Sequence, residues 1–183
     1  MQKSLLLISL ICATTVSAGL FSKKKVAAPV QLKAVPAVLT EAIQFIDGLG
    51  VGIIKEDIGA DLQRCYSGAG DLKHDITHAI QDFEIGGILG YISGALRIIK
   101  LIKELPTSFS GCKDAGAGLK KFVGWAETQF ADISALESKM ATNFLWNSKT
   151  VIGDAEDGIT QAKAGDYYDS GLDIGKAVSI LTQ

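Results

Sequence analysis

The chain has 183 residues, of which 48% are hydrophobic, with three cysteines and a formal net charge of −2. A chain of this length is expected to form one domain around a core of its own. Phosphate binding needs a basic face, so the charge balance argues against a nucleic-acid-binding protein.

The first 18 residues predict a secretory signal peptide. Lys3 precedes an apolar run, which ends in Val16-Ser17-Ala18 with small residues at both recognition positions. The run is shorter than the roughly 20 apolar residues that a spanning helix needs. We therefore expect cleavage after Ala18 and a protein that is secreted, outside the cell or in a secretory vesicle, with no transmembrane helix.

Residues 19–35 predict a flexible basic arm. They show no sustained apolar period, contain Pro29, and carry Lys23, Lys24, Lys25 and Lys33. Such lysines are usually solvated, and the alternative is contact with an anionic membrane or glycan. The rest of the chain, residues 36–183, is then a single acidic helical domain.

Apolar spacing in this domain predicts an all-α fold, a bundle or array of about six helices in hairpin repeats. The expected helices span residues 36–53, 57–83, 85–105, 109–130, 131–163 and 167–182. Pro106 is expected to end the third helix, and Gly153 to interrupt the fifth. Gly48, Gly50 and Gly52 are expected to let another backbone approach the first helix closely.

An internal repeat links the segment from Cys65 to Phe83 with the segment from Cys112 to Phe130. Aligning the two cysteines also aligns Leu72 with Leu119, Ile76 with Val123, Ala79 with Ala126 and Phe83 with Phe130. The shared positions recur at helical spacing, so they predict the buried faces of two similar helices docked on each other. In an oxidising compartment Cys65 and Cys112 are expected to form a disulfide, and the alternative is two separately buried thiols.

A second internal similarity relates two Asp-aromatic steps, that is, an aspartate followed directly by an aromatic residue. They are Asp82-Phe83, followed by Gly87, and Asp166-Tyr167, followed by Gly171. We expect each Asp-aromatic step to lie at a helix junction. The aspartate there would cap the next helix by accepting hydrogen bonds from its free amides.

The chain resembles a family of small secreted two-cysteine α-helical proteins abundant in ciliate protozoa. The resemblance rests on Phe45-Ile46-Asp47-Gly48 with the glycines that follow, on the two cysteines, and on the ending AKAGDYYDSGLDIGKAVSIL. That family has no assigned enzymatic activity. The resemblance therefore implies secretion, helices and a disulfide, and it adds no active-site residues.

His74 and His78 have the spacing of metal ligands, because residues i and i+4 share one helix face. A zinc hydrolase of the H-E-x-x-H kind needs a glutamate beside the first histidine, and this chain has Asp75 there. We read the pair mainly as a solvated face, with a metal site or pH sensing as alternatives.

The predicted helix of residues 85–105 has a broad apolar face opposite Arg97, Lys100 and Lys103. The face comprises Ile88, Tyr91, Ile92, Leu96 and Ile99. It suits the core of a helical bundle, and it also suits an apolar ligand or a membrane interface.

The sequence offers no catalytic signature, such as a G-x-S-x-G elbow, and both thiols are expected to be paired. We therefore expect a non-enzymatic protein without cofactors. It would act by self-association, as a homo-oligomer, or by contact with other secreted proteins. The alternative is a carrier of lipid or another apolar small ligand, or a membrane-surface binding protein.

Overall fold

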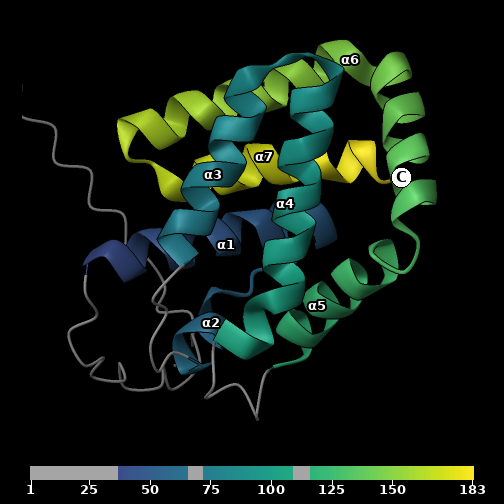
Figure 1. Ribbon diagram of the computed structural model, residues 1–183. Helices are drawn as coiled ribbons and strands as arrows, with labels where there is room; N and C mark the ends of the chain where they lie inside the picture. Colours follow the sequence, from purple (N-terminus) through teal and green to yellow (C-terminus); the bar gives the residue numbers. More distant parts are fainter. Residues whose placement is uncertain (1–36, 66–71, 109–115) are drawn as a thin grey trace, which may run out of the picture. The chain divides into compact units, whose positions relative to one another are not determined.

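A computed structural model describes residues 37–65, 72–108 and 116–183, which all belong to one compact unit, Ala34–Gln183. These residues form seven helices and confirm the all-α class (Figure 1). The helices are α1 (Ala37–Ile54), α2 (Gly59–Cys65), α3 (Leu72–Ile85), α4 (Gly87–Ser108), α5 (Ala117–Gln129), α6 (Ile133–Ala164) and α7 (Tyr167–Leu181). The predicted signal peptide, the basic arm and Cys112 lie outside the described residues.

Helices α1 and α7 form the most extensive pair, because glycines let their backbones touch. A Cβ added at Gly171 would lie 2.0 Å from the carbonyl oxygen of Phe45, and one at Gly48 would lie 2.1 Å from that of Tyr168. A Cβ added at Gly52 would lie 2.5 Å from the carbonyl oxygen of Leu172. No side chain larger than hydrogen fits at these positions, which confirms the predicted close approach at Gly48 and Gly52.

Helix α6 leads into α7 through the junction that the Asp-aromatic step predicted. Gly165 ends α6 with a positive φ of 83°, a conformation that favours glycine. Asp166 then caps α7, where its side chain accepts a hydrogen bond from the amide of Asp169 at 3.3 Å.

The same prediction is wrong for Asp82-Phe83. Helix α3 continues past this step to Ile85, and the turn follows at Gly86 and Gly87, with φ of 69° and 65°. Asp82 instead accepts from Nε of Arg97 at 2.7 Å on α4. A charged partner on the neighbouring helix therefore holds this aspartate in place of a cap.

Helices α3 and α5 each pack mainly against α4. The shared positions of the predicted repeat face inward: Leu72, Ile76, Ala79 and Phe83 are buried in α3, and Leu119, Val123 and Ala126 in α5. Helix α3 does not dock on α5 as expected, since the two are not among the extensively packed helix pairs of the described residues, and it is α2, the first part of the predicted helix, that contacts α5. Helix α4 separates the two similar faces.

Several helix ends differ from the prediction. The expected helix of residues 57–83 is described as α2 and α3, and residues 66–71 between them lie outside the described residues. Helix α4 passes through Pro106 and reaches Ser108. A proline so near the C-terminal end removes one helical hydrogen bond and leaves few turns to disrupt. Gly116 precedes α5 with extended backbone, so that helix starts later than expected.

The interruption of α6 occurs at Asn147 rather than at Gly153. Asn147 has φ of −123° and ψ of 17°, outside the helical range. Its side-chain amide donates to the carbonyl oxygen of Asn143 at 3.0 Å. The side chain thus supplies a local bond that competes with the helix, whereas Gly153 stays helical.

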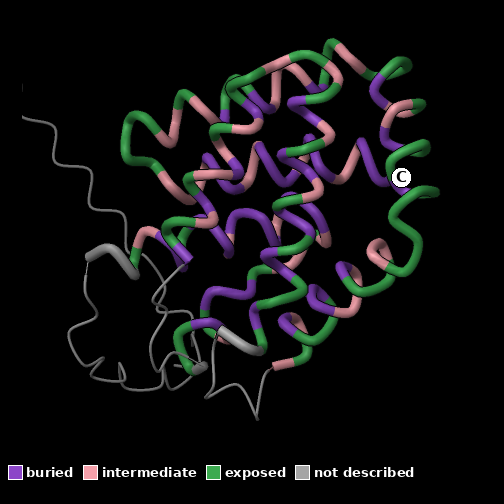
Figure 2. Tube along the Cα trace, viewed as in Figure 1, coloured by how far each residue is buried: buried purple, intermediate pink, exposed green. Residues whose placement is uncertain are grey.

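The core unites two groups of helices. One group consists of α1, α6 and α7, which come from the two ends of the domain's sequence. The other group consists of α3, α4 and α5, which come from the middle of the sequence. Contacts between the groups are fewer than contacts within them. Figure 2 shows buried residues along α1 and α7, whereas the first half of α6 is largely exposed. The seam between the groups is where a cleft is found.

Candidate functional site

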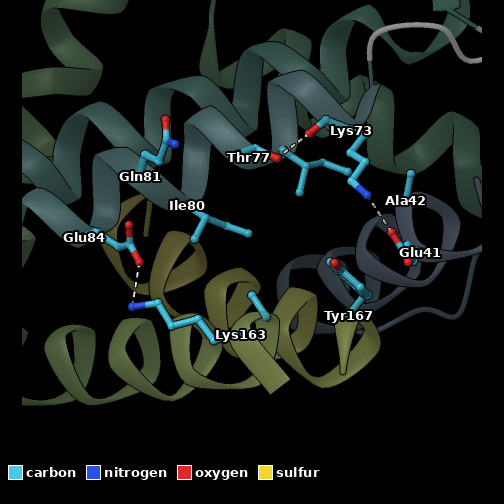
Figure 3. Close-up of a pocket in the computed structure, with 11 residues that line it drawn as sticks. Glu41, Ala42, Lys73, Thr77, Ile80, Gln81, Glu84, Lys163 and Tyr167 are labelled. Atoms are coloured by element: carbon cyan, nitrogen blue, oxygen red, sulfur yellow. Dashed lines mark hydrogen bonds and ion pairs between the residues drawn. The ribbon is translucent and has the colours of Figure 1, made fainter. Parts of the chain in front are cut away.

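A cleft of about 220 Å³ lies on this seam, between α3 on one side and α1, α6 and α7 on the other (Figure 3). Its floor is apolar. Ala42 of α1 and Ile76 of α3 are buried there, and the half-buried Ile80 and Ala162 extend the apolar surface. Tyr167, the first residue of α7, borders the same space.

Two ion pairs bridge the helices at the rims of the cleft. Nζ of Lys73 lies 3.1 Å from Oε2 of Glu41, which joins α3 to α1. Nζ of Lys163 lies 2.7 Å from Oε1 of Glu84, which joins α6 to α3. Figure 3 shows the two pairs with Ile80 between them. The cleft therefore combines an apolar floor with one acid and one base at each end.

Large apolar side chains are exposed at two other places. Leu145 and Trp146, which we call the kink pair, directly precede Asn147 and are 71% and 83% exposed. Ile85 and Leu89, which we call the turn pair, flank the α3–α4 turn and are 75% and 79% exposed. The ring of Phe144 stacks on Tyr91 of α4 with centroids 5.4 Å apart, so the buried side of α6 is anchored just before the kink pair.

His74 and His78 do share one face of α3, and their rings meet edge to face with centroids 4.2 Å apart. In the described parts of the chain, no group of three or more His, Cys, Asp and Glu side chains could hold a metal ion. Asp82, which the sequence places one turn further along, is engaged by Arg97. The structure therefore brings the two histidines together without assembling further ligands around them from the described residues.

The predicted apolar face of α4 lies against other helices. Tyr91 and Ile99 are buried, and Ile88, Ile92 and Leu96 are half-buried and pack on the core. A ligand or membrane on this face would have to displace those packed residues.

Asp61 links α2 to the start of α5. Its Oδ2 accepts from the amide of Leu119 at 3.4 Å, and its Oδ1 accepts from Arg64 at 2.7 Å. Gly116 has no side chain to cap α5, so Asp61 supplies a carboxylate from another helix. The predicted Cys65–Cys112 disulfide itself involves side chains outside the described part of the chain.

Asp47 has a similar role for α2, where its Oδ1 accepts from the amide of Ile58 at 2.8 Å. Burial raises the pKa of this carboxyl group, and the nearby charge of Asp57 raises the pKa further. The amides of Ile58 and Gly59 act in the opposite direction. Asp47 is therefore a structural cap that is costly to ionise.

Burial also raises the pKa of Asp154 in α6, and Lys176 partly offsets this effect. The pKa of Lys176 is itself raised, chiefly by its hydrogen bond to Asp173 at 2.5 Å. Asp154 and Asp173 thus place two carboxylates beside the single ammonium group of Lys176.

None of the helices in the described residues is long and apolar enough to cross a membrane. Comparisons with protein-family models, curated proteins and solved structures find no match to this chain. The resemblance to the ciliate family thus stays an expectation from the sequence.

Sequence reasoning missed both the cleft and the kink pair. The cleft residues come from distant segments, and only the tertiary fold brings Glu41 to Lys73 and Glu84 to Lys163. The exposure of the kink pair could have been predicted from the sequence. Leu145 and Trp146 follow Phe144 directly, so a helix that buries Phe144 must turn these two large apolar side chains away from the stripe.

Proposed function

We propose that the chain is a non-catalytic protein that acts by self-association through the kink pair of α6. This proposal rests on the exposure of two large apolar side chains at adjacent positions, Leu145 and Trp146. A large apolar patch on a protein surface marks an interaction site more often than a scattered single residue does. Tryptophan is also enriched among the side chains that contribute most to interfaces.

The local geometry supports a rigid contact. The buried neighbour Phe144 stacks on Tyr91, and the amide of Asn143 donates to the carbonyl oxygens of Leu181 and Gln183 at 3.0 and 2.9 Å. These bonds hold the exposed pair on an anchored segment, so little side-chain or backbone ordering is needed on binding. Full burial of one leucine side chain is worth roughly 1.5–3 kcal/mol relative to leaving it exposed.

A carrier of a whole lipid is a weaker proposal. The predicted face of α4 is packed within the core, and the cleft on the seam has about 220 Å³. Sites for drug-sized ligands typically occupy about 300–1,000 Å³. The cleft therefore favours a smaller ligand than an acyl lipid.

The test is the concentration dependence of the mass of the purified chain, measured by analytical ultracentrifugation and native mass spectrometry. We expect a reversible oligomer, and we expect the double variant Leu145→Ser with Trp146→Ser to raise the dissociation constant by at least about tenfold.

Ile133→Ser is the matched control, because Ile133 is an exposed apolar residue of the same helix, 45% exposed. It should leave the oligomer unchanged. A chain that stays monomeric up to high micromolar concentration would contradict the proposal. A monomer that binds neutral phosphatidylcholine vesicles through Trp146 would favour the membrane-surface alternative.

A further inference from the structure

The cleft on the seam has features of a ligand site that self-association does not use. Its floor is apolar, and its two ends carry Glu41 with Lys73 and Glu84 with Lys163. The kink pair is not part of its lining. The residues that line the cleft come from α1, α3, α6 and α7.

The charges of the cleft select the class of ligand. Each end presents one carboxylate and one ammonium, so the four groups sum to zero formal charge. A simple anion would take the lysine of a pair and leave the glutamate without its partner, and a simple cation would do the reverse. A zwitterion meets both charges at once and replaces one ion pair with two charge-assisted contacts.

Opening either pair costs little. The side chains of Lys73 and Lys163 are 53% and 68% exposed. Solvent-exposed ion pairs contribute little to the stability of a fold. The rims can therefore open without loss of the fold, which the buried floor residues Ala42 and Ile76 help to hold.

The Glu41–Lys73 end is the better site for the charged groups. Its nitrogen and oxygen are 3.1 Å apart, against 2.7 Å at the other end, and Lys73 is less exposed than Lys163. The buried Ala42 adjoins Glu41 in the sequence, and Figure 3 shows Tyr167 on the same side of the cleft. A ligand held here can lay an apolar group along Ile76 and Ile80.

The volume limits the length of that group. A cavity of about 150 Å³ lined by apolar side chains holds benzene, and this cleft has about 220 Å³. The available space fits one branched aliphatic or aromatic side chain in addition to a small charged head.

We propose that the cleft binds a small zwitterionic amphiphile of the class of free apolar α-amino acids. The ammonium group contacts Glu41, the carboxylate contacts Lys73, and the apolar side chain lies over Ile76 and Ile80.

The test is a titration of the purified chain, with ¹³C-labelled isoleucine methyl groups, with leucine and phenylalanine. The methyl signals of Ile76 and Ile80 should shift and saturate, while Ile58, which does not line the cleft, should not shift. Three probes dissect leucine: 4-methylpentanoate lacks the ammonium, 3-methylbutylamine lacks the carboxylate, and glycine lacks the apolar group. Each should bind at least about tenfold more weakly than leucine.

Protein variants test the chosen end. Glu41→Gln and Lys73→Met should each weaken leucine binding by about tenfold or more. Glu84→Gln is the matched control, because it breaks the equivalent pair at the other rim, and it should leave leucine binding within about twofold. An unchanged Ile58 methyl signal shows that each variant is folded.

The proposal is overturned if leucine gives no saturable shift at Ile76 and Ile80, if 4-methylpentanoate or 3-methylbutylamine binds as well as leucine, or if Glu41→Gln binds leucine normally. These outcomes are independent of self-association, because the variant Leu145→Ser with Trp146→Ser should retain leucine binding in full. Loss of the oligomer and loss of the ligand are thus separate results.

Discussion

At the scale of single residues, Asp47 caps a helix with a carboxyl group that its surroundings make costly to ionise. The carboxylate accepts a hydrogen bond from the amide of Ile58, yet burial and Asp57 raise its pKa above the ordinary value of 3.8. The folded protein therefore binds a proton at Asp47 more tightly than the unfolded chain does. The stability that comes from this tighter proton binding is fully present below pH 3.8. It is lost as the pH rises through the higher pKa of the folded protein.

We predict that Asp47→Asn keeps an acceptor for the amide of Ile58 and removes this pH dependence. Relative to the unsubstituted chain, its free energy of unfolding should increase from pH 3.5 upward and level off above the folded pKa of Asp47. Urea denaturation followed by circular dichroism at several pH values measures the difference. A constant difference across this range would contradict the raised pKa.

Asp47→Ala tests the cap itself. It removes the acceptor as well as the charge, so its free energy of unfolding at pH 7 should be about 1 kcal/mol below that of Asp47→Asn. The comparison with Asp47→Asn separates the hydrogen bond from the charge, because only the alanine variant loses the bond. Equal stability of the two variants at pH 7 would show that Ile58 does not depend on this cap.

At the scale of elements, the crossing of α1 and α7 depends on glycine. We predict that Gly171→Ala lowers the free energy of unfolding by at least about 2 kcal/mol, because the new Cβ would meet the backbone of Phe45 at 2.0 Å. Backbone atoms cannot rotate away, so the two helices would have to separate. Thermal or urea denaturation provides the measurement.

Gly153→Ala is the matched control for that substitution. Gly153 lies within α6, and a Cβ there would meet nothing within 4 Å. Alanine should therefore raise the free energy of unfolding by roughly 0.5–1 kcal/mol through better helix propensity. A destabilised Gly153→Ala, or a neutral Gly171→Ala, would contradict the packing described for these helices.

Helices were predictable from the sequence where their signals were local. The apolar spacing located α1 and α7 to within a residue or two, and Gly165 with Asp166 marked the junction before α7. The errors came from competing interactions. Asp82 forms a salt bridge with Arg97 and does not cap a helix. The interruption of α6 was expected at Gly153 but occurs at Asn147, whose side chain bonds to the carbonyl oxygen of Asn143.

The arrangement of helices and the cleft were not predictable in this way. Similar faces on α3 and α5 suggested that the two helices dock on each other, but a repeat specifies which residues are buried and not which helix covers them. Helix α4 contacts both. The rim pairs join residues far apart in the sequence, such as Glu41 with Lys73, and no local pattern encodes such a pair.

At the scale of the whole domain, packing is uneven. The two ends of the domain meet in α1 and α7, whose residues Phe45, Leu49, Ile174 and Val178 are fully buried. The first half of α6, residues 133–146, buries far fewer side chains, namely Leu136, Met140 and Phe144. Regions with few buried contacts open locally at a lower free energy than the rest of a domain.

We predict that amide hydrogen exchange in the dilute, monomeric chain, followed by mass spectrometry, is slowest in α1 and α7 and at least about a hundredfold faster in residues 133–146. Asn143→Ala should speed exchange in this segment further, because it removes the hydrogen bonds to the carbonyl oxygens of Leu181 and Gln183. Thr142→Ala is the matched control, since the hydroxyl of Thr142 donates to the carbonyl oxygen of Ser138 within α6 itself. Uniform exchange across the domain would contradict the unequal packing. At high protein concentration the proposed self-association should slow exchange in the first half of α6, since the kink pair lies within it.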